Sequence, residues 1–380
     1  MSHQYQVRNP VLVAPAIAAL LILASCGRAP EPAASADSAL TPEMLATKKS
    51  STMVPLGPWQ QGDQKGMANT IGAGTWLRCA HYLTQDGANS YELSHVRSNG
   101  MTQSPFGVPL VYEYRPTTGV PGTLHAFNGE QIATGEPGAQ GTQMDALGHF
   151  AYLSEAWDGQ GDFPADDASY YSGYRQSDVK PSATSPLLKL GIEQAPPIIT
   201  TAVLLDARSH LGNGEMLAAG YAITAAEIES MIEAQGLGWR GLLPGDVLYI
   251  YTGWSDIWET PEYYTKGPGL AYDAVRLIEE KQVVLVALDN PFTDPVNAGQ
   301  LTGQAGPPES APARLPFINH HHNLTQSGIH QIQNLKLDEL ARDKVWTSCT
   351  MILPLRSQGN SGSPVRPVAI GSGQGIGTTK

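Results

Sequence analysis

The chain has 380 residues, of which 41% are hydrophobic and 15% are charged, a composition typical of a globular protein rather than a disordered one. Its formal net charge is -12 and it carries no cluster of Lys or Arg, which argues against a nucleic-acid partner. The length suits one large or two ordinary domains, and we predict one because the sequence shows neither an internal repeat nor a second linker.

Residues 1–25 are predicted to be a signal peptide of the lipoprotein type. The apolar run over residues 11–24 is too short to span a bilayer comfortably. It ends in the sequence LASC at residues 23–26, which resembles a bacterial lipobox and implies lipidation of Cys26; a plain secretory signal with a chance cysteine is the alternative. Gly27 follows, as in lipoproteins sorted to the outer membrane. We therefore expect a lipid anchor on the periplasmic side of a bacterial membrane, with the outer membrane favoured.

A linker and one folded domain follow the signal peptide. Residues 26–53 are rich in Ala, Pro and Ser without apolar periodicity, which is typical of a linker, and residues 54–380 are predicted to form the domain. Cys79 and Cys349 lie in the domain. An oxidising compartment permits a disulfide between them, but the sequence leaves open whether they meet.

The middle of the chain alternates strand and helix signals, which favours an α/β domain. A Thr224–Glu227 capping box begins a predicted helix that Gly236 ends. The other predicted elements are strands over residues 202–206, 246–251 and 283–288 and a helix over 273–281. Residues 90–150 are poor in helix formers and predict short strands and loops, and the many Gly and Pro residues predict long ordered loops.

Residues 141–149 (GTQMDALGH) combine the side chains that a hydrolytic site needs. Gly141 allows a tight turn, and Gln143 and Asp145 point the same way in an extended segment. His149 follows after four residues and can return to the same pocket. A turn with a capping Asp and a buried His is the structural alternative for this segment.

Six segments in chain order resemble the cyclase family of metal-dependent amide hydrolases, which includes kynurenine formamidases and isatin hydrolases. In chain order, the resemblance rests on residues 59–69 against WGxxDxxGxxN, 139–149 against HxGTHxDxPxH, 245–254 against GDxxLxxTGW, 286–289 against the strand that follows, 321–335 against HHxLLxxGIxxxENL, and 363–367 against SPxRP. It implies an α/β fold: a single cyclase-like swivelling β/β/α domain with a mixed sheet, helices and long loops.

The resemblance also assigns roles, residue by residue. The central carboxylate falls on Asp145, the general base on His149, and a histidine ligand on His321. A glutamate ligand falls on Gln333, and two leading histidine ligands fall on Ala139 and Gln143, so three charged or imidazole ligands are replaced. We therefore expect one divalent ion, manganese or zinc, held by Gln143, Asp145, His321 and Gln333; a two-zinc site is poorly supported because zinc favours nitrogen and sulfur ligands.

Two further sets of residues are candidates for the same pocket. His125 or His320 can supply a missing nitrogen ligand, although nothing in the spacing requires either. Phe106, Tyr152 and Trp254 can form an aromatic wall for a planar substrate, although aromatic residues near such motifs are more often plain core.

The resemblance implies a metal-dependent hydrolase of a carbon–nitrogen amide bond, in an arylformamide or a cyclic amide, that uses a metal-activated water and His149 as the base. It further implies a small-molecule amide or lactam substrate and a homodimer or homotetramer. The alternative is a non-catalytic ligand-binding lipoprotein that keeps the fold with a degenerate metal site.

Overall fold

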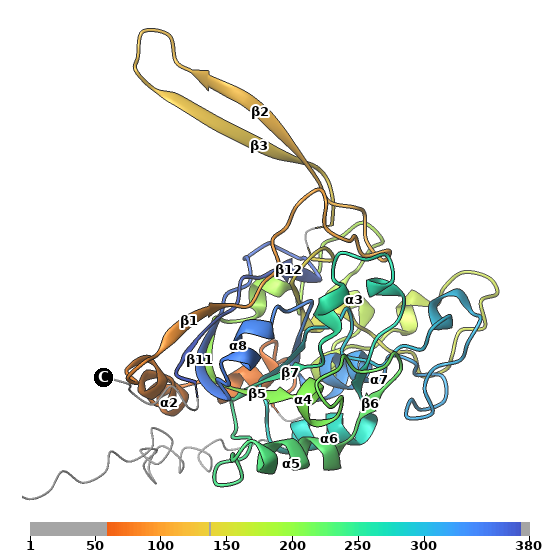
Figure 1. Ribbon diagram of the computed structural model, residues 1–380. Helices are drawn as coiled ribbons and strands as arrows, with labels where there is room; N and C mark the ends of the chain where they lie inside the picture. Colours follow the sequence, from red (N-terminus) through yellow and green to blue (C-terminus); the bar gives the residue numbers. More distant parts are fainter. Residues whose placement is uncertain (1–58, 137, 374–380) are drawn as a thin grey trace, which may run out of the picture. The chain divides into compact units, whose positions relative to one another are not determined.

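The computed structural model describes residues 59–136 and 138–373 (Figure 1). The predicted signal peptide, Cys26, the linker and the predicted domain start at residue 54 lie outside the described residues. The strands are β1 Asn89–Glu92, β2 Val111–Gly119, β3 Ala126–Thr134, β4 Gln143–Asp145, β5 Ile198–Asp206, β6 Ala222–Ile223, β7 Val247–Tyr251, β8 Gly269–Leu270, β9 Leu285–Leu288, β10 His330–Gln333, β11 Thr347–Ile352, β12 Gly362–Pro364 and β13 Val368–Gly371. The α-helices are α2 Ala73–Leu83, α3 Gln176–Val179, α4 Ala207–His210, α5 Ala225–Ala234, α6 Tyr272–Glu280, α7 Ile318–His321 and α8 Asp338–Arg342.

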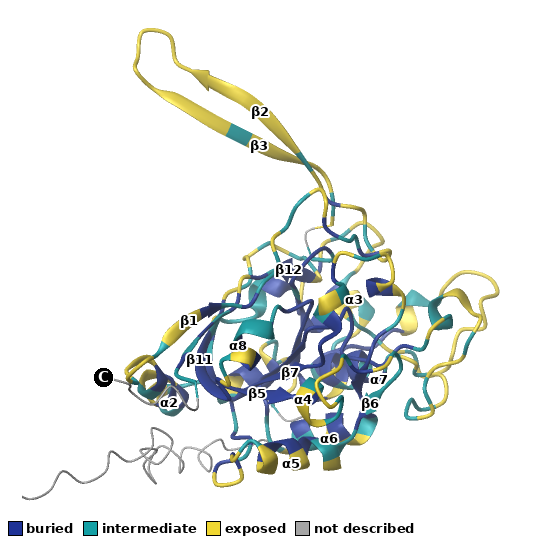
Figure 2. Cartoon of the chain, in the orientation of Figure 1, coloured by how far each residue is buried: buried dark blue, intermediate teal, exposed yellow. Residues whose placement is uncertain are grey.

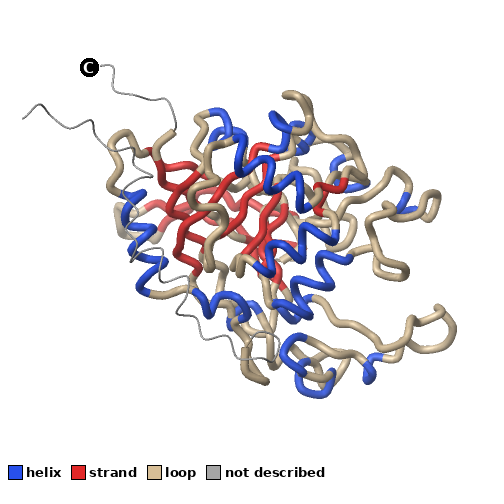
Figure 3. The backbone as a smooth tube through the Cα atoms, turned by 90° about the horizontal axis from the view of Figure 1, so that it is seen from below, coloured by secondary structure: helices blue, strands red, loops and turns tan. Residues whose placement is uncertain are grey.

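A nine-stranded mixed sheet organises the described chain, in the order β1-β13-β11-β5-β7-β9-β10-β4-β12. The central strands β5, β7, β9 and β10 are parallel, and the strands on both sides of them pair antiparallel. Helix α2 packs on β5 and β11, and α5 packs on β5 and α6. Figure 3 shows the strands at the centre with helices along their flanks. The α/β class with a mixed sheet is therefore confirmed.

The core forms where the central strands are apolar on both faces. Every residue of β7 and β9 is buried, as is every residue of β5 except Ile199. Such continuous apolar strands are typical of parallel strands covered on both sides. Figure 2 shows this buried centre.

The elements predicted for the middle of the chain are confirmed. The three strands correspond to β5, β7 and β9, and the two helices to α5 and α6. Thr224 caps α5: its side chain accepts a hydrogen bond from the Glu227 amide, and Glu227 accepts one in return from the Thr224 amide. The described residues between 90 and 150 contain no α-helix, but β2 and β3 have nine residues each and are longer than the short strands predicted there.

The disulfide that the sequence left open is formed. Cys79 on α2 bonds Cys349 on β11, and both are buried beside Tyr82. The bond ties residues 270 positions apart and fixes α2 to the sheet. No helix among the described residues has both the length and the apolar character needed to cross a membrane.

The motif at residues 59–69 organises a loop. The Asp63 carboxylate accepts hydrogen bonds from the Gly66 amide at 2.7 Å and from the Asn69 side chain at 2.9 Å. Gly66 has φ +58, and a Cβ there would lie 2.0 Å from the carbonyl oxygen of Gly328. Only glycine fits this position, so the motif brings two distant loops into contact.

Strands β2 and β3 form a hairpin that is exposed along nearly its whole length (Figure 2). The exposed residues include Tyr114, Phe127 and Ile132. Residues on both sides of the hairpin line the cavity described next: Ser104 and Phe106 before it, and Glu136, Gly138 and Ala139 after it.

Candidate active site

Strand β4 carries the central carboxylate, and a turn before it fixes the strand's position. Gly141 has φ +76, and its carbonyl oxygen accepts a hydrogen bond from the Asn334 side chain at 2.7 Å. The Thr142 hydroxyl donates to the Asn334 carbonyl at 2.5 Å. Gln143 and Asp145 then pair with Gln333 and Gln331 of β10 across an antiparallel register. These bonds hold the two candidate segments of the chain together.

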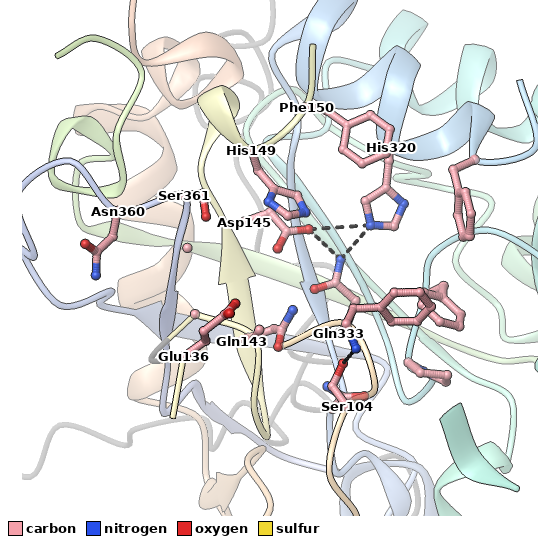
Figure 4. A pocket seen from close by; sticks show the side chains of 18 of the residues that line it. Ser104, Glu136, Gln143, Asp145, His149, Phe150, His320, Gln333, Asn360 and Ser361 are labelled. Atoms are coloured by element: carbon pink, nitrogen blue, oxygen red, sulfur yellow. Dashed lines mark hydrogen bonds and ion pairs between the residues drawn. The ribbon is translucent and has the colours of Figure 1, made fainter. Parts of the chain in front are cut away.

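A cavity of about 640 Å³ lies over this part of the sheet. Figure 4 shows Asp145, His149, His320 and Gln333 meeting in it. Its described lining consists of Ser104, Phe106, Glu136, Gly138, Ala139, Gln143, Asp145, His149, Phe150, Tyr264, Pro291, Phe292, Phe317, His320, Gln333, Asn334, Gly359, Asn360, Ser361 and Gly362. Of the predicted site residues, Gln143, Asp145, His149 and Gln333 line it, and His321 does not.

Asp145, His320 and Gln333 form a triangle of polar atoms. The Gln333 Nε2 donates to Asp145 Oδ2 at 2.7 Å and lies 3.3 Å from His320 Nε2. His320 Nε2 lies 3.6 Å from Asp145 Oδ2. All three side chains are buried, so these contacts form away from bulk water. In Figure 4 the amide of Gln333 bridges the acid and the imidazole.

Asp294 orients the His320 ring. Its Oδ2 lies 2.5 Å from His320 Nδ1, and Oδ1 accepts a hydrogen bond from the Asn319 amide at 2.6 Å. With Nδ1 held by this carboxylate, Nε2 is the nitrogen that faces the cavity. Burial lowers the pKa of His320, but the hydrogen bond to Asp294 and the charges of Asp294 and Asp145 outweigh it, so the pKa is raised from its usual 6.5.

His149 reaches the cavity from a short 3-10 turn, Leu147–His149, directly after β4. Its ring is exposed to the cavity, with its centre 6.4 Å from that of His320. Protein surrounds this concave site, and the resulting desolvation lowers the pKa of His149 below 6.5 although Asp145 acts in the opposite direction. A neutral imidazole beside a carboxylate is suited to accept a proton.

The structure places His320, and not His321, in the cavity. Successive residues on α7 point about 100° apart, so only one of the two can face β4. His321 instead packs edge-to-face on Tyr152, with ring centres 5.6 Å apart. The Asp294 carboxylate accepts a hydrogen bond from His320 and not from His321. Nothing in the sequence indicated that Asp294 lies beside this histidine. His125, the other histidine considered as a source of a missing nitrogen ligand, is exposed in the connection between β2 and β3 and does not line the cavity.

A row of aromatic rings forms one wall of the cavity. Ring centres are 5.7 Å apart from Phe106 to Phe292 and from Phe292 to Phe317, and 6.0 Å apart from Phe317 to His320. Phe150 lies 5.2 Å from His320 on the other side. Of the predicted aromatic wall only Phe106 belongs to it, because Trp254 is buried in a separate core cluster and Tyr152 lies outside the lining.

The residues present fit one divalent ion better than two. No group of three His, Cys, Asp or Glu side chains that could hold a metal occurs among the described residues. The edges of the triangle of Asp145, His320 and Gln333 are 2.7, 3.3 and 3.6 Å, two of them measured to the Gln333 amide nitrogen, and they bracket the roughly 3.0–3.4 Å that separate ligands around an ion with bonds of about 2.1 Å. The side-chain amide oxygens (Oε1) of Gln333 and Gln143 are buried without a hydrogen-bond partner. Turning the Gln333 amide would present its oxygen to such an ion.

A family model and one solved structure support the fold. The family model described as "Putative cyclase" matches residues 91–295, more than half of the chain. The chain belongs to the cyclase family. A crystal structure described as a novel cyclase matches with a TM-score of 0.65 and 24% identity over 83% of this chain and 96% of that chain. Isatin hydrolase A from Ralstonia solanacearum matches with a TM-score of 0.48 and 19% identity over 74% of this chain and 92% of that chain. A search of curated proteins finds no match.

Proposed function

We propose that this cyclase-family chain is a hydrolase that cleaves the carbon–nitrogen bond of an arylformamide or a cyclic amide. The single observation that carries the proposal is the cavity in which His149, Asp145, His320 and Gln333 meet beside a row of aromatic rings. The polar group supplies acid–base chemistry, and the rings suit a planar substrate.

Protein groups account for the proton movements. His149, whose pKa the surrounding protein lowers by desolvation, takes a proton from water as the water oxygen attacks the substrate carbonyl. The carbon–nitrogen bond then breaks, and His149 returns the proton to the leaving nitrogen, giving a carboxylic acid and an amine. Asp145 stabilises the imidazolium that forms between the two transfers.

Asp145, His320 and an amide oxygen of Gln333 or Gln143 would hold one divalent ion in this proposal, and manganese suits an oxygen-rich set better than zinc does. When bound, the ion would supply Lewis-acid polarisation and a more acidic water. With one carboxylate among these three donors, we expect weak binding that needs added metal.

Hydrolysis and ion content test the proposal together. The purified chain should hydrolyse formanilide or isatin faster than buffer does when Mn²⁺ or Zn²⁺ is added, and His149→Ala should remove this activity while leaving the ion-dependent rise in melting temperature intact. Loss of the thermal rise in His149→Ala would make His149 a ligand. The absence of hydrolysis by the unaltered chain would refute the hydrolase, and the absence of a thermal rise would refute the ion site.

A non-catalytic ligand-binding protein is the second candidate. The observation that favours it is the donor set itself: Ala139, Gln143 and Gln333 stand where the family resemblance expects two histidines and a glutamate. In that case the cavity would bind aromatic amides without turnover, and calorimetry would detect binding of a ligand that remains intact after long incubation.

Assembly and location are further proposals. The exposed apolar residues of the β2–β3 hairpin, including Tyr114 and Phe127, support a homodimer or homotetramer, because an isolated hairpin of this kind is marginally stable in water. Light scattering of the chain with and without residues 111–134 tests this. Lipidation of Cys26 and a periplasmic location at the outer membrane are tested by mass spectrometry of the membrane fraction.

A further inference from the structure

Gln140 is a fully buried residue whose side-chain polar atoms all bind one loop. Its Oε1 accepts a hydrogen bond from the Ser104 amide at 2.8 Å. Its Nε2 donates to three carbonyl oxygens of the same loop, those of Ser104 at 3.2 Å, Gly107 at 3.3 Å and Val108 at 3.2 Å. The side chain therefore holds the loop at residues 104–108 at both of its ends.

The same loop packs directly on the turn that precedes β4. A Cβ at Gly107 would lie 2.7 Å from the Ala139 Cβ, closer than two such carbons approach in proteins. Glycine leaves room for this contact because it has no side chain. Ala139 and Gln140 are neighbours in the turn, so the segment that carries the candidate site residues also holds this loop in place.

The loop carries Phe106, which begins the row of aromatic rings along the cavity. Its ring packs edge-to-face on Phe292, with ring centres 5.7 Å apart and planes at 76°. Phe106 is nevertheless 58% exposed, so packing of its own side chain holds it only weakly. The position of this ring therefore depends on the loop backbone on either side of it, which Gln140 binds at Ser104 and Gly107.

From these contacts we infer that Gln140 is a positioning residue: it holds the loop at residues 104–108 so that Phe106 completes the cavity wall and favours substrates with an aromatic ring. The inference rests on the proposed function in taking this cavity as the substrate site. Loss of the Gln140 amide leaves the Ser104 amide and the loop carbonyls without their partner, and such groups move toward water. Phe106 then leaves the row, and an aromatic ligand loses a ring contact that a saturated ring cannot make with the same geometry.

Two formamides with a six-membered ring test the inference: formanilide, whose ring is aromatic, and N-cyclohexylformamide, whose ring is saturated. Their affinities are measured by calorimetry at one fixed concentration of Mn²⁺ in the His149→Ala variant, so that binding is separated from turnover. We expect formanilide to bind at least about fivefold more tightly. Gln140→Ala and Phe106→Ala, each in this background, should reduce the ratio to below about twofold, whereas a general loosening of the fold would weaken both ligands alike.

Three further variants locate the origin of the preference. Gln140→Ala combined with Phe106→Ala should lower the ratio no further than either change alone, because both act through the same ring. Gly107→Ala leaves Gln140 in place but pushes the loop away from Ala139, so it should lower the ratio as well. Gln235→Ala, which removes an amide that binds two backbone groups of β5, is the matched control and should leave the ratio unchanged.

Several results would overturn the inference. These are equal affinities in the parent variant, binding of neither ligand, additive effects of Gln140→Ala and Phe106→Ala, and an equal effect of the control Gln235→Ala. If Gln140→Ala fails to fold, Gly107→Ala decides the matter, and an unchanged ratio in that variant would overturn the inference.

The outcomes separate this inference from the proposed function. A preference for the aromatic ring that depends on Gln140, without hydrolysis by the unaltered chain, would retain the inference and reject the hydrolase. Hydrolysis of formanilide with an unchanged ratio in Gln140→Ala would retain the hydrolase and reject the role of Gln140. If both hold, Gln140→Ala should raise KM for formanilide and leave kcat within about twofold, because the change removes binding rather than chemistry.

Discussion

Replacing Gln333 by Glu exchanges the amide that bridges Asp145 and His320 for a second carboxylate. The amide nitrogen now lies 2.7 Å from Asp145 Oδ2. Two negative oxygens at that distance would repel by about 6 kcal/mol at an effective dielectric constant of 20. A divalent ion between the two carboxylates relieves this repulsion, so the substitution should raise the affinity for the ion. If only a quarter of the repulsion is relieved, the gain of about 1.5 kcal/mol raises the affinity for Mn²⁺ or Zn²⁺ roughly tenfold.

Melting temperature measured against metal concentration is the assay. Without metal, Gln333→Glu should melt below the unaltered chain, and added ion should raise its melting temperature at concentrations at least about tenfold lower. Gln326→Glu, at an exposed position in the segment after α7, adds the same charge outside the cavity and is the matched control. An unchanged metal response in Gln333→Glu would refute the reasoning that the triangle is an ion site.

Three further predictions concern the base, the histidine support and the disulfide. Because desolvation lowers the pKa of His149 below its usual 6.5, the acid side of the pH–rate profile, where the base becomes protonated, should have its midpoint below pH 6.5; a midpoint above pH 6.5 would contradict this. Asp294→Asn should weaken ion binding by about 10–100-fold, measured by calorimetry, because it loosens the His320 ring; unchanged affinity would remove Asp294 from the site. Replacing Cys79 and Cys349 together by Ala should lower the free energy of unfolding by up to about 5 kcal/mol in denaturant titrations, and a loss within 0.5 kcal/mol would show that the bond adds nothing.

The regular elements were predictable because their signals are local. The Thr224–Glu227 capping box, the apolar spacing of α5 and α6, and the continuous apolar runs of β5, β7 and β9 each act over a few residues. The periodicity of the apolar residues and the capping residues indicate such elements without reference to tertiary contacts. The nine-stranded order depends on long-range pairing, and only the family resemblance indicated a mixed sheet.

The candidate site was predictable in part. Gln143, Asp145 and His149 share one short segment, so the sequence could indicate that they meet, and the resemblance added Gln333 from β10. His321 was singled out in place of His320 because a run of three histidines has no internal signal of which one faces inward. That choice is made by Asp294, 26 positions earlier in the chain.

Most of the aromatic side chains that line the cavity gave no signal in the sequence. Phe292 and Phe317 lie in loops, so neither spacing nor periodicity points to them. They line the cavity only because the fold brings the end of β9 and the start of α7 to the same place. Loops that fall outside any repeat pattern acquire such roles through tertiary structure alone.

Several of the motifs that resemble the cyclase family instead hold the loops around the site. Asp246 accepts hydrogen bonds from Arg240 and from the Leu243 amide, and Asp289 accepts from both the amide and the hydroxyl of Thr252. The second pair joins the ends of β7 and β9. These buried carboxylates place the loops that carry the cavity lining without facing the cavity themselves.

The most direct test of the central claim compares the unaltered chain with Asp145→Asn in the hydrolysis of isatin and formanilide at saturating Mn²⁺. Asp145 lies between His149, His320 and Gln333, so the account predicts measurable turnover by the unaltered chain and a loss of at least about 100-fold in the variant. Turnover that survives in Asp145→Asn, or none by the unaltered chain, would contradict it.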